Sequence, residues 1–407
     1  MTTLTPTTVE DVAEIVRDAI EAKQTLELVG SGSRRGYGRV PQADATLDLS
    51  TLSGVVAYEP AELVLTARPA TPMAEIRALL AQHGQSLAFE PPDLSAGWGR
   101  PRGSGTLGGA LSLGFGGPRR PYAGAARDHF LGFKAVNGYG EAFGAGGRVV
   151  KNVTGYDLPK LMAGAMGTLG VLTEVTVKVL PAPQTVETVV LTGLDPARAV
   201  AALSAAQNSA AQVTGAAVLP PQVLAAFPDL PDGEMVALIR LEGVAPSLPS
   251  RRAVLADVLA HFTAPTELLG EAASERVWTA VADAAPFADA SRPLWRITLP
   301  PASAPDVIMA LAYDDSIGGQ RGYLDWGGGL IWLEVDGQHP EQAAALRAHL
   351  AAIPGANATL VRGDAALRST IPPLQPLEPG LLALTRRVKA QFDPHGLFNP
   401  GRLYEGV

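Results

Sequence analysis

Apolar residues recur at helical spacing near the N-terminus and at strand spacing directly after it. Between residues 7 and 22 the valines, isoleucines and alanines fall on one stripe, and Thr7 with Glu10 forms a candidate capping box. This spacing predicts an amphipathic helix. Short apolar runs then predict a series of strands, and Thr71 followed by Pro72 predicts the start of a helix that ends before Gly84. The expected strands cover residues 25–29, 46–49, 55–59 and 63–68.

After residue 181 glycine becomes sparser, and apolar strands alternate with helices rich in alanine and leucine. The longest uncharged run, residues 199–228, contains polar side chains and a Pro220-Pro221 break, which favours a helix followed by a strand over a membrane span. A proline-rich linker is expected at residues 371–379, before a last helix at 380–391. No repeat of fixed period is found. Further strands are expected at residues 188–191, 235–241, 295–299 and 330–335.

A chain of 407 residues exceeds one ordinary hydrophobic core, so more than one domain is expected. The change in glycine content and in the pattern of apolar residues near residue 183 divides the chain into a first domain, residues 1–183, and a second domain, residues 184–375. Residues 376–407 form a C-terminal segment. The second domain is expected to be an α+β cap with ferredoxin-like alternation of helices and strands.

Composition and charge exclude several classes of protein. The net charge is −8 and no block of basic residues occurs, which argues against general nucleic-acid binding. The absence of cysteine excludes disulfides, iron–sulfur clusters, thiolate zinc sites and a cysteinyl cofactor link in this chain. The first residues lack the basic and apolar regions of a secretory signal, so a cytoplasmic location is expected.

Glycine-rich turns are the main candidates for a binding site. The GSGS loop at residues 30–33, followed by two arginines, suits an anion-binding nest or, equally, a plain hairpin turn. Gly103-x-Gly105-x-x-Gly108 matches the dinucleotide fingerprint in form, but no strand precedes it, which argues against a Rossmann unit. Motifs for a P-loop, a zincin or an α/β-hydrolase do not occur.

Several motifs in fixed order carry a resemblance to a known family. They are GTLGG at residues 105–109, KNVTGYDLPKL at 151–161, GTLGVLTEV at 167–175 and FDPHGLFNPGR at 392–402. Together they resemble the FAD-binding fold of the vanillyl-alcohol oxidase (PCMH) type. With GGPRRPYAGAARDHFLGF at 116–133, they are most similar to the small FAD-binding subunits of bacterial glycolate oxidases.

The resemblance implies a two-subdomain PCMH-type α+β fold in which residues 376–407 return to the first domain and cover the flavin. It also implies that the first glycine loop holds the FAD pyrophosphate by backbone donors. Dissociable FAD is expected, because the chain has no cysteine and no histidine occurs at 30–38. For His129 both a flavin contact and a structural role stay open, with the structural role favoured. The residues implied for FAD binding are Gly30, Ser31, Gly32, Ser33, Arg34, Gly105, Thr106, Leu107, Gly108, Gly109, Ser112, Gly114, Asp128, Gly170, Val171, Asn399 and Arg402.

Catalytic residues are harder to identify. A carboxylate anchor could come from several side chains, each of which could equally form a structural contact. Relatives that oxidise 2-hydroxy acids carry closely spaced histidines that bind a metal, whereas no two of the histidines here are two to four residues apart. We therefore expect no metal site and assign no catalytic residue. The anchor candidates are Arg119, Arg120, Lys151, Tyr156 and Arg321; the histidines are His83, His129, His261, His339, His349 and His395.

Three hypotheses follow. The first is an FAD-binding subunit of a complex that oxidises glycolate to glyoxylate. The complex would also contain a catalytic flavin subunit and an iron–sulfur subunit, and these partner subunits would supply any membrane association. The second is a self-sufficient FAD-linked oxidase of another alcohol or hydroxy acid, with Tyr156, Tyr323 or Glu334 as the base. The third is a flavin-free scaffold, which the intact glycine loops make the least favoured.

Overall fold

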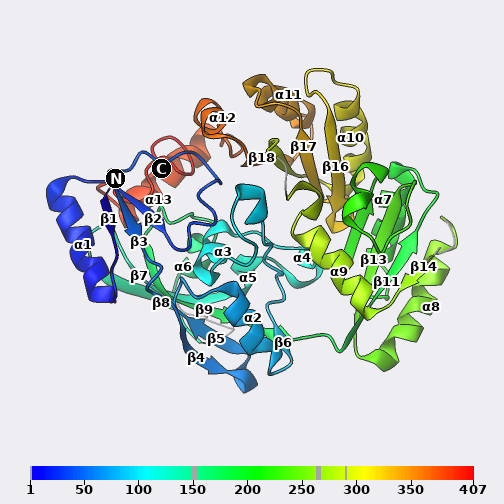
Figure 1. The fold of residues 1–407 in the computed structure, drawn as a ribbon, viewed down its shortest axis with the longest axis horizontal. Helices are drawn as coiled ribbons and strands as arrows, with labels where there is room; N and C mark the ends of the chain where they lie inside the picture. The colour runs from blue at the N-terminus through cyan, green and yellow to red at the C-terminus, as the bar shows by residue number, and fades with distance from the viewer. Residues whose placement is uncertain (1, 149–154, 263–266, 289–290) are drawn as a thin grey trace. The chain divides into compact units, whose positions relative to one another are not determined.

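The computed structural model describes residues 2–148, 155–262, 267–288 and 291–407, which form two compact units (Figure 1). The first unit comprises Met1–Gly116, Gly124–Ala182 and Pro376–Val407, and the second comprises Gly117–Ala123 and Pro183–Gln375. Within the described part of the chain, the structure has no helix with the length and apolar character needed to cross a bilayer.

The first unit contains two main sheets. A parallel sheet has the order β1-β3-β2, and a five-stranded antiparallel sheet has the order β4-β5-β9-β7-β8. The strands are β1 (Thr2–Leu4), β2 (Leu26–Val29), β3 (Ala45–Asp48), β4 (Val55–Glu59), β5 (Val64–Ala67), β7 (Phe130–Val136), β8 (Ala142–Gly146) and β9 (Val171–Lys178), with a small pair β6 (Gln85–Ser86) and β10 (Leu180–Pro181). The helices are α1 (Val9–Ala22), α2 (Met73–Ala81), α3 (Leu107–Leu113), α5 (Ala126–His129), α6 (Leu158–Met162) and α13 (Pro379–Phe392).

Helix α1 forms where its apolar stripe predicts it, but its capping box lies one residue later than Thr7 and Glu10. Thr8 is the N-cap: its hydroxyl accepts from the Asp11 amide at 3.0 Å, and the Asp11 carboxylate accepts from the Thr8 amide at 2.9 Å. The Asp11 carboxylate also accepts from Thr7, which holds the pKa of that carboxyl at about 2. The apolar face of α1 packs on the parallel sheet.

The second unit contains one eight-stranded sheet built from two copies of the same motif. Each copy runs β-α-β-β-α-β, and the sheet order β14-β11-β13-β12-β16-β17-β15-β18 places two ferredoxin-like motifs side by side. The first copy is β11 (Thr185–Leu191), α7 (Pro196–Gln207), β12 (Gly215–Leu219), β13 (Val236–Gly243), α8 (Leu248–Leu259) and β14 (Glu267–Leu269). The second is β15 (Leu294–Thr298), α10 (Ala304–Ala312), β16 (Gln320–Asp325), β17 (Leu330–Val335), α11 (Pro340–Leu350) and β18 (Asn357–Arg362). Helices α9 (Glu271–Ala282) and α12 (Ala365–Thr370) follow the two copies.

The duplication of the motif leaves no repeat of fixed period in the sequence, because the two copies differ in their loop lengths. The two copies join through the antiparallel pairing of β12 with β16, in which Val218 faces Leu324. Corresponding strands are separated by unequal lengths of chain, since the loops within the copies differ. The alternation of helices and strands is therefore as expected. That it consists of two ferredoxin-like motifs is seen only in the strand order of the sheet.

The two faces of the eight-stranded sheet differ in chemistry. Helices α7, α8, α10 and α11 pack on one face in a continuous apolar core. On β13, Ile239 and Leu241 belong to this core, whereas the alternate residues Arg240 and Glu242 are buried on the opposite face.

Residues 117–123, which include α4 (Arg120–Ala123), group with the second unit although the sequence places them within the first domain. The Arg119 guanidinium donates to the buried Glu242 carboxylate at 3.0 Å, and the indole of Trp326 donates to the Gly117 carbonyl at 3.0 Å. These contacts hold the segment on the polar face of the sheet.

The C-terminal helix α13 carries a buried cation that joins it to the rest of the first unit. The Lys389 ammonium donates to the Thr168 carbonyl at 2.7 Å, the Phe398 carbonyl at 2.9 Å and the Asp393 carboxylate at 2.6 Å. Burial lowers the pKa of Lys389, while Asp393 opposes that shift. The Asp393 carboxylate also accepts the amides of Leu397 and Phe398, so it fixes the turn that follows the helix.

Replacing Lys389 by methionine leaves the Asp393 charge buried without its partner. We expect Lys389→Met to lower the free energy of unfolding by about 3–5 kcal/mol, measured by urea unfolding followed by circular dichroism. Lys160→Met is the matched control, because Lys160 pairs with Asp157 at an exposed site, where the loss is at most about 1 kcal/mol. Equal losses in the two variants would contradict the anchoring role of Lys389.

Candidate functional site

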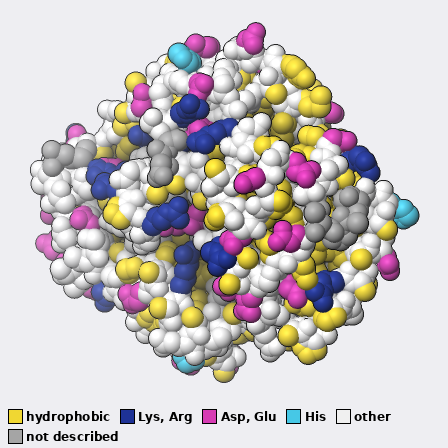
Figure 2. Space-filling model, turned by 45° about the vertical axis from the view of Figure 1, so that its right-hand side comes forward, with side chains coloured by type: hydrophobic (Ala, Val, Ile, Leu, Met, Phe, Trp, Pro, Cys, Tyr) yellow, Lys and Arg dark blue, Asp and Glu magenta, His cyan; other side chains and the backbone are white. Residues whose placement is uncertain are grey.

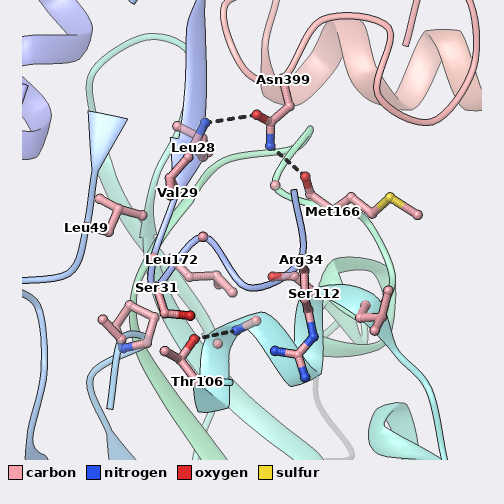
Figure 3. A pocket seen from close by; sticks show the side chains of 18 of the residues that line it. Leu28, Val29, Ser31, Arg34, Leu49, Thr106, Ser112, Met166, Leu172 and Asn399 are labelled. Atoms are coloured by element: carbon pink, nitrogen blue, oxygen red, sulfur yellow. Dashed lines mark hydrogen bonds between the residues drawn. The ribbon is translucent and has the colours of Figure 1, made fainter. Parts of the chain in front are cut away.

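A pocket in the first unit is built from six stretches of chain. They are the end of β2 with the following loop, the residue Leu49 after β3, the turn after β5, Thr106 with α3, the segment from α6 to β9, and the C-terminal tail. Figure 3 shows side chains from these stretches around the cavity. The lining residues are Leu28, Val29, Gly30, Ser31, Gly32, Ser33, Arg34, Arg35, Tyr37, Leu49, Pro69, Ala70, Thr106, Gly108, Gly109, Ser112, Leu113, Met162, Ala165, Met166, Gly167, Gly170, Leu172, Asn399 and Arg402.

Asn399 joins three of these stretches. Its side-chain oxygen accepts from the Leu28 amide at 2.9 Å, and its amide group donates to the Met166 carbonyl at 2.7 Å, as the dashed lines in Figure 3 show. The Asn399 backbone amide donates to the Leu26 carbonyl at 2.9 Å. Its φ of 45° is left-handed, a conformation that asparagine tolerates better than most residues. Asn399 thus fixes the tail against β2 and the loop before β9.

Arg34 brings a buried positive group to the pocket. Its Nε atom is buried and has no hydrogen-bond partner among the described residues. Burial lowers the pKa of Arg34 to about 10, and Asp93 opposes that shift. The guanidinium therefore stays charged at neutral pH. A buried cation with an unused donor favours an anionic ligand at this point.

Glycines in α3 allow two close approaches that shape the pocket. A Cβ at Gly108 would lie 2.5 Å from the Pro69 Cβ and 2.8 Å from the Pro69 carbonyl oxygen. The Gly108 amide donates to that same carbonyl at 2.8 Å. A Cβ at Gly109 would lie 2.9 Å from Nη1 of Arg34. Glycine is thus required for α3 to meet Pro69 and the Arg34 side chain.

Most of the residues that the resemblance implies for cofactor binding come together here. From the first loop and the start of α3 these are Gly30, Ser31, Gly32, Ser33, Arg34, Thr106, Gly108, Gly109 and Ser112, and from the later segments they are Gly170, Asn399 and Arg402. Five others do not line the pocket, namely Gly105, Leu107, Gly114, Asp128 and Val171.

Each of the five makes another contact in the fold or is buried away from the pocket. The Gly105 carbonyl accepts from Met73, and the Leu107 side chain is fully buried in the core. Gly114 ends α3 with a φ of 74° and packs on Gly164. The Asp128 carboxylate accepts from the amide of Ala125. Val171 pairs with Val136 in the sheet, and its side chain is fully buried.

Of the residues considered as anchors for a substrate carboxylate, three contact other side chains and one is exposed to solvent. Arg119 is bound to Glu242, Arg120 stacks on the Trp326 ring at 4.6 Å, and Arg321 donates to Glu334 at 2.8 Å. Tyr156 is 89% exposed. Lys151 lies outside the described residues.

Two of the candidate bases are buried within the second unit. The Tyr323 hydroxyl donates to the Val281 carbonyl at 2.6 Å, and burial raises the pKa of this hydroxyl well above its ordinary value. The Glu334 carboxylate is fully buried and accepts from Arg321 and from Arg362, the latter at 2.9 Å. Both groups are therefore engaged in packing the sheet.

The histidines do not form a metal site in the described part of the chain, where no group of three or more histidines and carboxylates is placed to hold a metal ion. His349 Nε2 lies 2.7 Å from the Asp314 carboxylate, and His339 lies 3.7 Å from Glu341. His129 is buried at the end of α5, with its ring 5.5 Å from that of Phe89, and it does not line the pocket.

Comparison with known proteins identifies the family. A model described as "FAD binding domain" matches residues 2–146, and one described as "FAD linked oxidases, C-terminal domain" matches residues 375–403. The glycolate oxidase subunit GlcE of Escherichia coli is 35% identical over 96% of this chain and 96% of its own length. The chain belongs to the family of FAD-linked oxidases. It is thus a member of an FAD-dependent oxidoreductase family, with FAD as its cofactor.

Other relatives of the FAD-linked oxidase family match only part of the chain. The glycolate oxidase subunit GlcD of Bacillus subtilis is 28% identical over 46% of this chain and 38% of its own length. A D-2-hydroxyglutarate dehydrogenase of Xanthomonas citri is 33% identical over 44% of this chain and 36% of its own. These matches concern a shared portion rather than the whole protein.

Solved structures confirm the fold class. p-Cresol methylhydroxylase has a TM-score of 0.75 at 15% identity, covering 100% of this chain and 88% of its own. Alkyldihydroxyacetonephosphate synthase has a TM-score of 0.70 at 16% identity, covering 98% and 75%. The predicted PCMH-type α+β fold is therefore correct. A flavin-free scaffold loses its basis, because the family is defined by FAD binding.

The lining of the pocket fits FAD in its chemistry. Arg34 offers an unused buried donor to an anion, and the glycines of the loop and of α3 line the cavity without side chains that would narrow it. Leu28, Leu49 and Leu172 supply apolar walls against which a flat ring can pack. The combination of a positive loop and apolar walls matches a diphosphate joined to aromatic rings.

Sequence reasoning missed several residues that line the pocket. Leu28, Leu49 and Leu172 look like ordinary core positions, and nothing in their spacing marks them as binding residues. Met166 and Gly167 belong to the glycine-rich AMGTLG turn, which does carry a signal. A turn dense in glycine beside a strand could have identified them.

Alanine at Gly108 tests the close approach of α3 to Pro69. We expect Gly108→Ala to lower the free energy of unfolding by about 1–3 kcal/mol, because backbone atoms must move to admit the new methyl group. The measurement is urea unfolding. Gly380→Ala is the control, since a Cβ there has nothing within 4 Å. A stability of Gly108→Ala equal to that of the control would mean that Pro69 yields without cost.

Proposed function

We propose that this chain is the FAD-binding subunit of a multi-subunit oxidase that converts glycolate, or a related small 2-hydroxy acid, to the 2-oxo acid. The main support is the match to the E. coli glycolate oxidase subunit GlcE, which extends over 96% of both chains. Because both the cofactor unit and the duplicated second unit fall within that match, the similarity concerns the whole architecture. A D-2-hydroxyglutarate dehydrogenase among the partial matches is consistent with a 2-hydroxy acid.

In this proposal the pocket holds non-covalent FAD. The bound flavin would supply a two-electron redox centre to the enzyme. The loop of residues 30–34 and Arg402 would hold the pyrophosphate, with Arg34 donating from its buried guanidinium. Thr106, Gly109 and Ser112 would border the cofactor beside this loop. Asn399 would keep the tail closed over it.

The chain would act within a complex rather than alone. The relative that matches 96% of both chains is named a subunit, and so is the B. subtilis relative that matches 46% of this chain. We therefore infer that a catalytic flavin subunit and an iron–sulfur subunit complete the enzyme. The complex would work in the cytoplasm, with its partner subunits supplying any membrane attachment.

The visible spectrum of the purified chain tests this proposal. We expect flavin absorption bands after addition of FAD and removal of the unbound cofactor, and no bleaching of these bands by glycolate or lactate under anaerobic conditions. Co-purified partner subunits should restore bleaching. Bleaching of the isolated chain by either acid would overturn the subunit role, and absence of retained flavin would overturn FAD binding at this pocket.

Replacing Arg34 by glutamine tests its contact with the pyrophosphate. A hydrogen bond to a charged group contributes about 1.5–3 kcal/mol, so we expect FAD to bind roughly 10- to 150-fold more weakly. Riboflavin, which has no phosphate, should be affected little. The measurement is titration followed by flavin fluorescence.

Arg387→Gln is the matched control, because Arg387 is an exposed arginine on α13 that does not line the pocket. An equal loss of riboflavin and FAD affinity in Arg34→Gln would show that the substitution disturbs the pocket as a whole.

A further inference from the structure

A buried carboxylate on β2 contacts two of the arginines that line the pocket. Glu27 is the second residue of β2, and 5% of its surface is exposed. Its carboxylate accepts from Nε of Arg35 at 2.9 Å and from Nη2 of the same guanidinium. This two-point contact fixes the plane of the Arg35 side chain as well as its position.

The same carboxylate also reaches the C-terminal tail. Nη1 of Arg402 lies 3.8 Å from Oε1 of Glu27, while Nη2 of Arg402 donates to the Arg34 carbonyl at 2.9 Å. The Arg402 carbonyl in turn accepts from the Arg39 amide at 3.0 Å. Glu27 therefore lies between the two arginines that flank the loop, one within it and one returning from the tail.

The charges around the loop make this carboxylate important. Arg34, Arg35 and Arg402 all line the pocket, and the described lining contains no aspartate or glutamate. Three guanidinium groups around one loop repel one another unless an anion lies among them. Glu27 supplies a negative charge to Arg35 and Arg402, while Asp93 acts on Arg34.

We propose that Glu27 is a positioning residue for the diphosphate of the cofactor, acting through Arg35 and Arg402 rather than by touching the cofactor. This inference rests on the proposed FAD site. Glu27 fixes the direction of the Arg35 guanidinium by two hydrogen bonds and attracts that of Arg402 from 3.8 Å, and Arg402 in turn donates to the Arg34 carbonyl in the loop. The ligand class it serves is a diphosphate ester, because a neutral ligand gains nothing from this arrangement.

Two physical effects predict opposite results for Glu27→Gln, which makes the inference testable. Removal of a negative charge behind the pocket raises its positive potential, so electrostatics alone predicts tighter binding of FAD. Loss of the two-point contact frees Arg35 and Arg402 to move apart, so positioning predicts weaker binding. The sign of the change in FAD affinity therefore distinguishes the two effects.

The experiment titrates the flavin-free full chain with FAD and, separately, with riboflavin, at two salt concentrations. For Glu27→Gln we expect roughly 10- to 100-fold weaker binding of FAD, the loss typical of charged hydrogen bonds, and a change in riboflavin affinity within about twofold. The dependence of FAD affinity on salt should change as well, since the arginines no longer converge on the phosphates.

Companion variants keep the test valid if Glu27→Gln folds poorly. Glu27→Asp retains the charge but withdraws the carboxylate by one methylene, and it should weaken FAD binding less than Glu27→Gln. In an Arg35→Gln background the effect of Glu27→Gln should be smaller, because one of its two partners is already gone. Glu62→Gln removes the same charge at an exposed site and should leave FAD affinity unchanged.

Each other outcome overturns a defined part of the argument. Equal or tighter FAD binding by Glu27→Gln, while the unsubstituted chain binds FAD, overturns the positioning role and leaves the proposed function in place. An equal loss of FAD and riboflavin also overturns it, since the residue would then serve the fold in general. No FAD binding by the unsubstituted chain overturns the proposed function, and the positioning role with it.

Discussion

The attachment of the C-terminal segment through the buried Lys389 ammonium is the interaction on which the cofactor pocket depends. Lys389 lies on α13, two of its acceptors lie in the turn that follows the helix and the third lies in the segment before β9, so one side chain joins the tail to the body of the unit. The segment after α13 thereby meets β2 from the opposite end of the chain, where Phe398 bridges to Leu26. Asn399 and Arg402 reach the pocket because this attachment places the turn that precedes them.

The fold was largely predictable because each element carries a local signal. The stripe of α1, the apolar runs of β2 to β5 and the helix after residue 379 all appear close to where the pattern predicts them. The observed capping box lies one residue after the predicted one, because the pair Thr8 and Asp11 has the same spacing as the pair Thr7 and Glu10 and suits the motif equally well. The doubling of the ferredoxin-like motif was not predictable, since only the pairing of β12 with β16 reveals it and the loop lengths hide any period.

The site was predictable where glycine and charge mark it, and not where ordinary apolar residues or long-range pairing decide. The loop of residues 30–34 and the start of α3 carry such marks. Val171 and Leu172 show the limit, because neighbouring residues in a strand face opposite sides and only the structure says which one faces the pocket. Glu334 and Tyr323 resemble catalytic groups in the sequence, yet their partners are distant residues that pack the second sheet. Figure 2 shows one face of the molecule, on which basic, acidic and apolar side chains all occur.

The order of synthesis gives the discontinuous first unit a particular consequence. Residues 376–407 emerge from the ribosome only after the whole second unit, yet they supply Asn399 and Arg402 to a pocket whose other walls are made before residue 183. The nascent first unit must therefore wait through nearly two hundred residues of translation with its cofactor cavity open on one side. A chain interrupted at any point in that interval lacks the two tail residues, Asn399 and Arg402, that line the pocket.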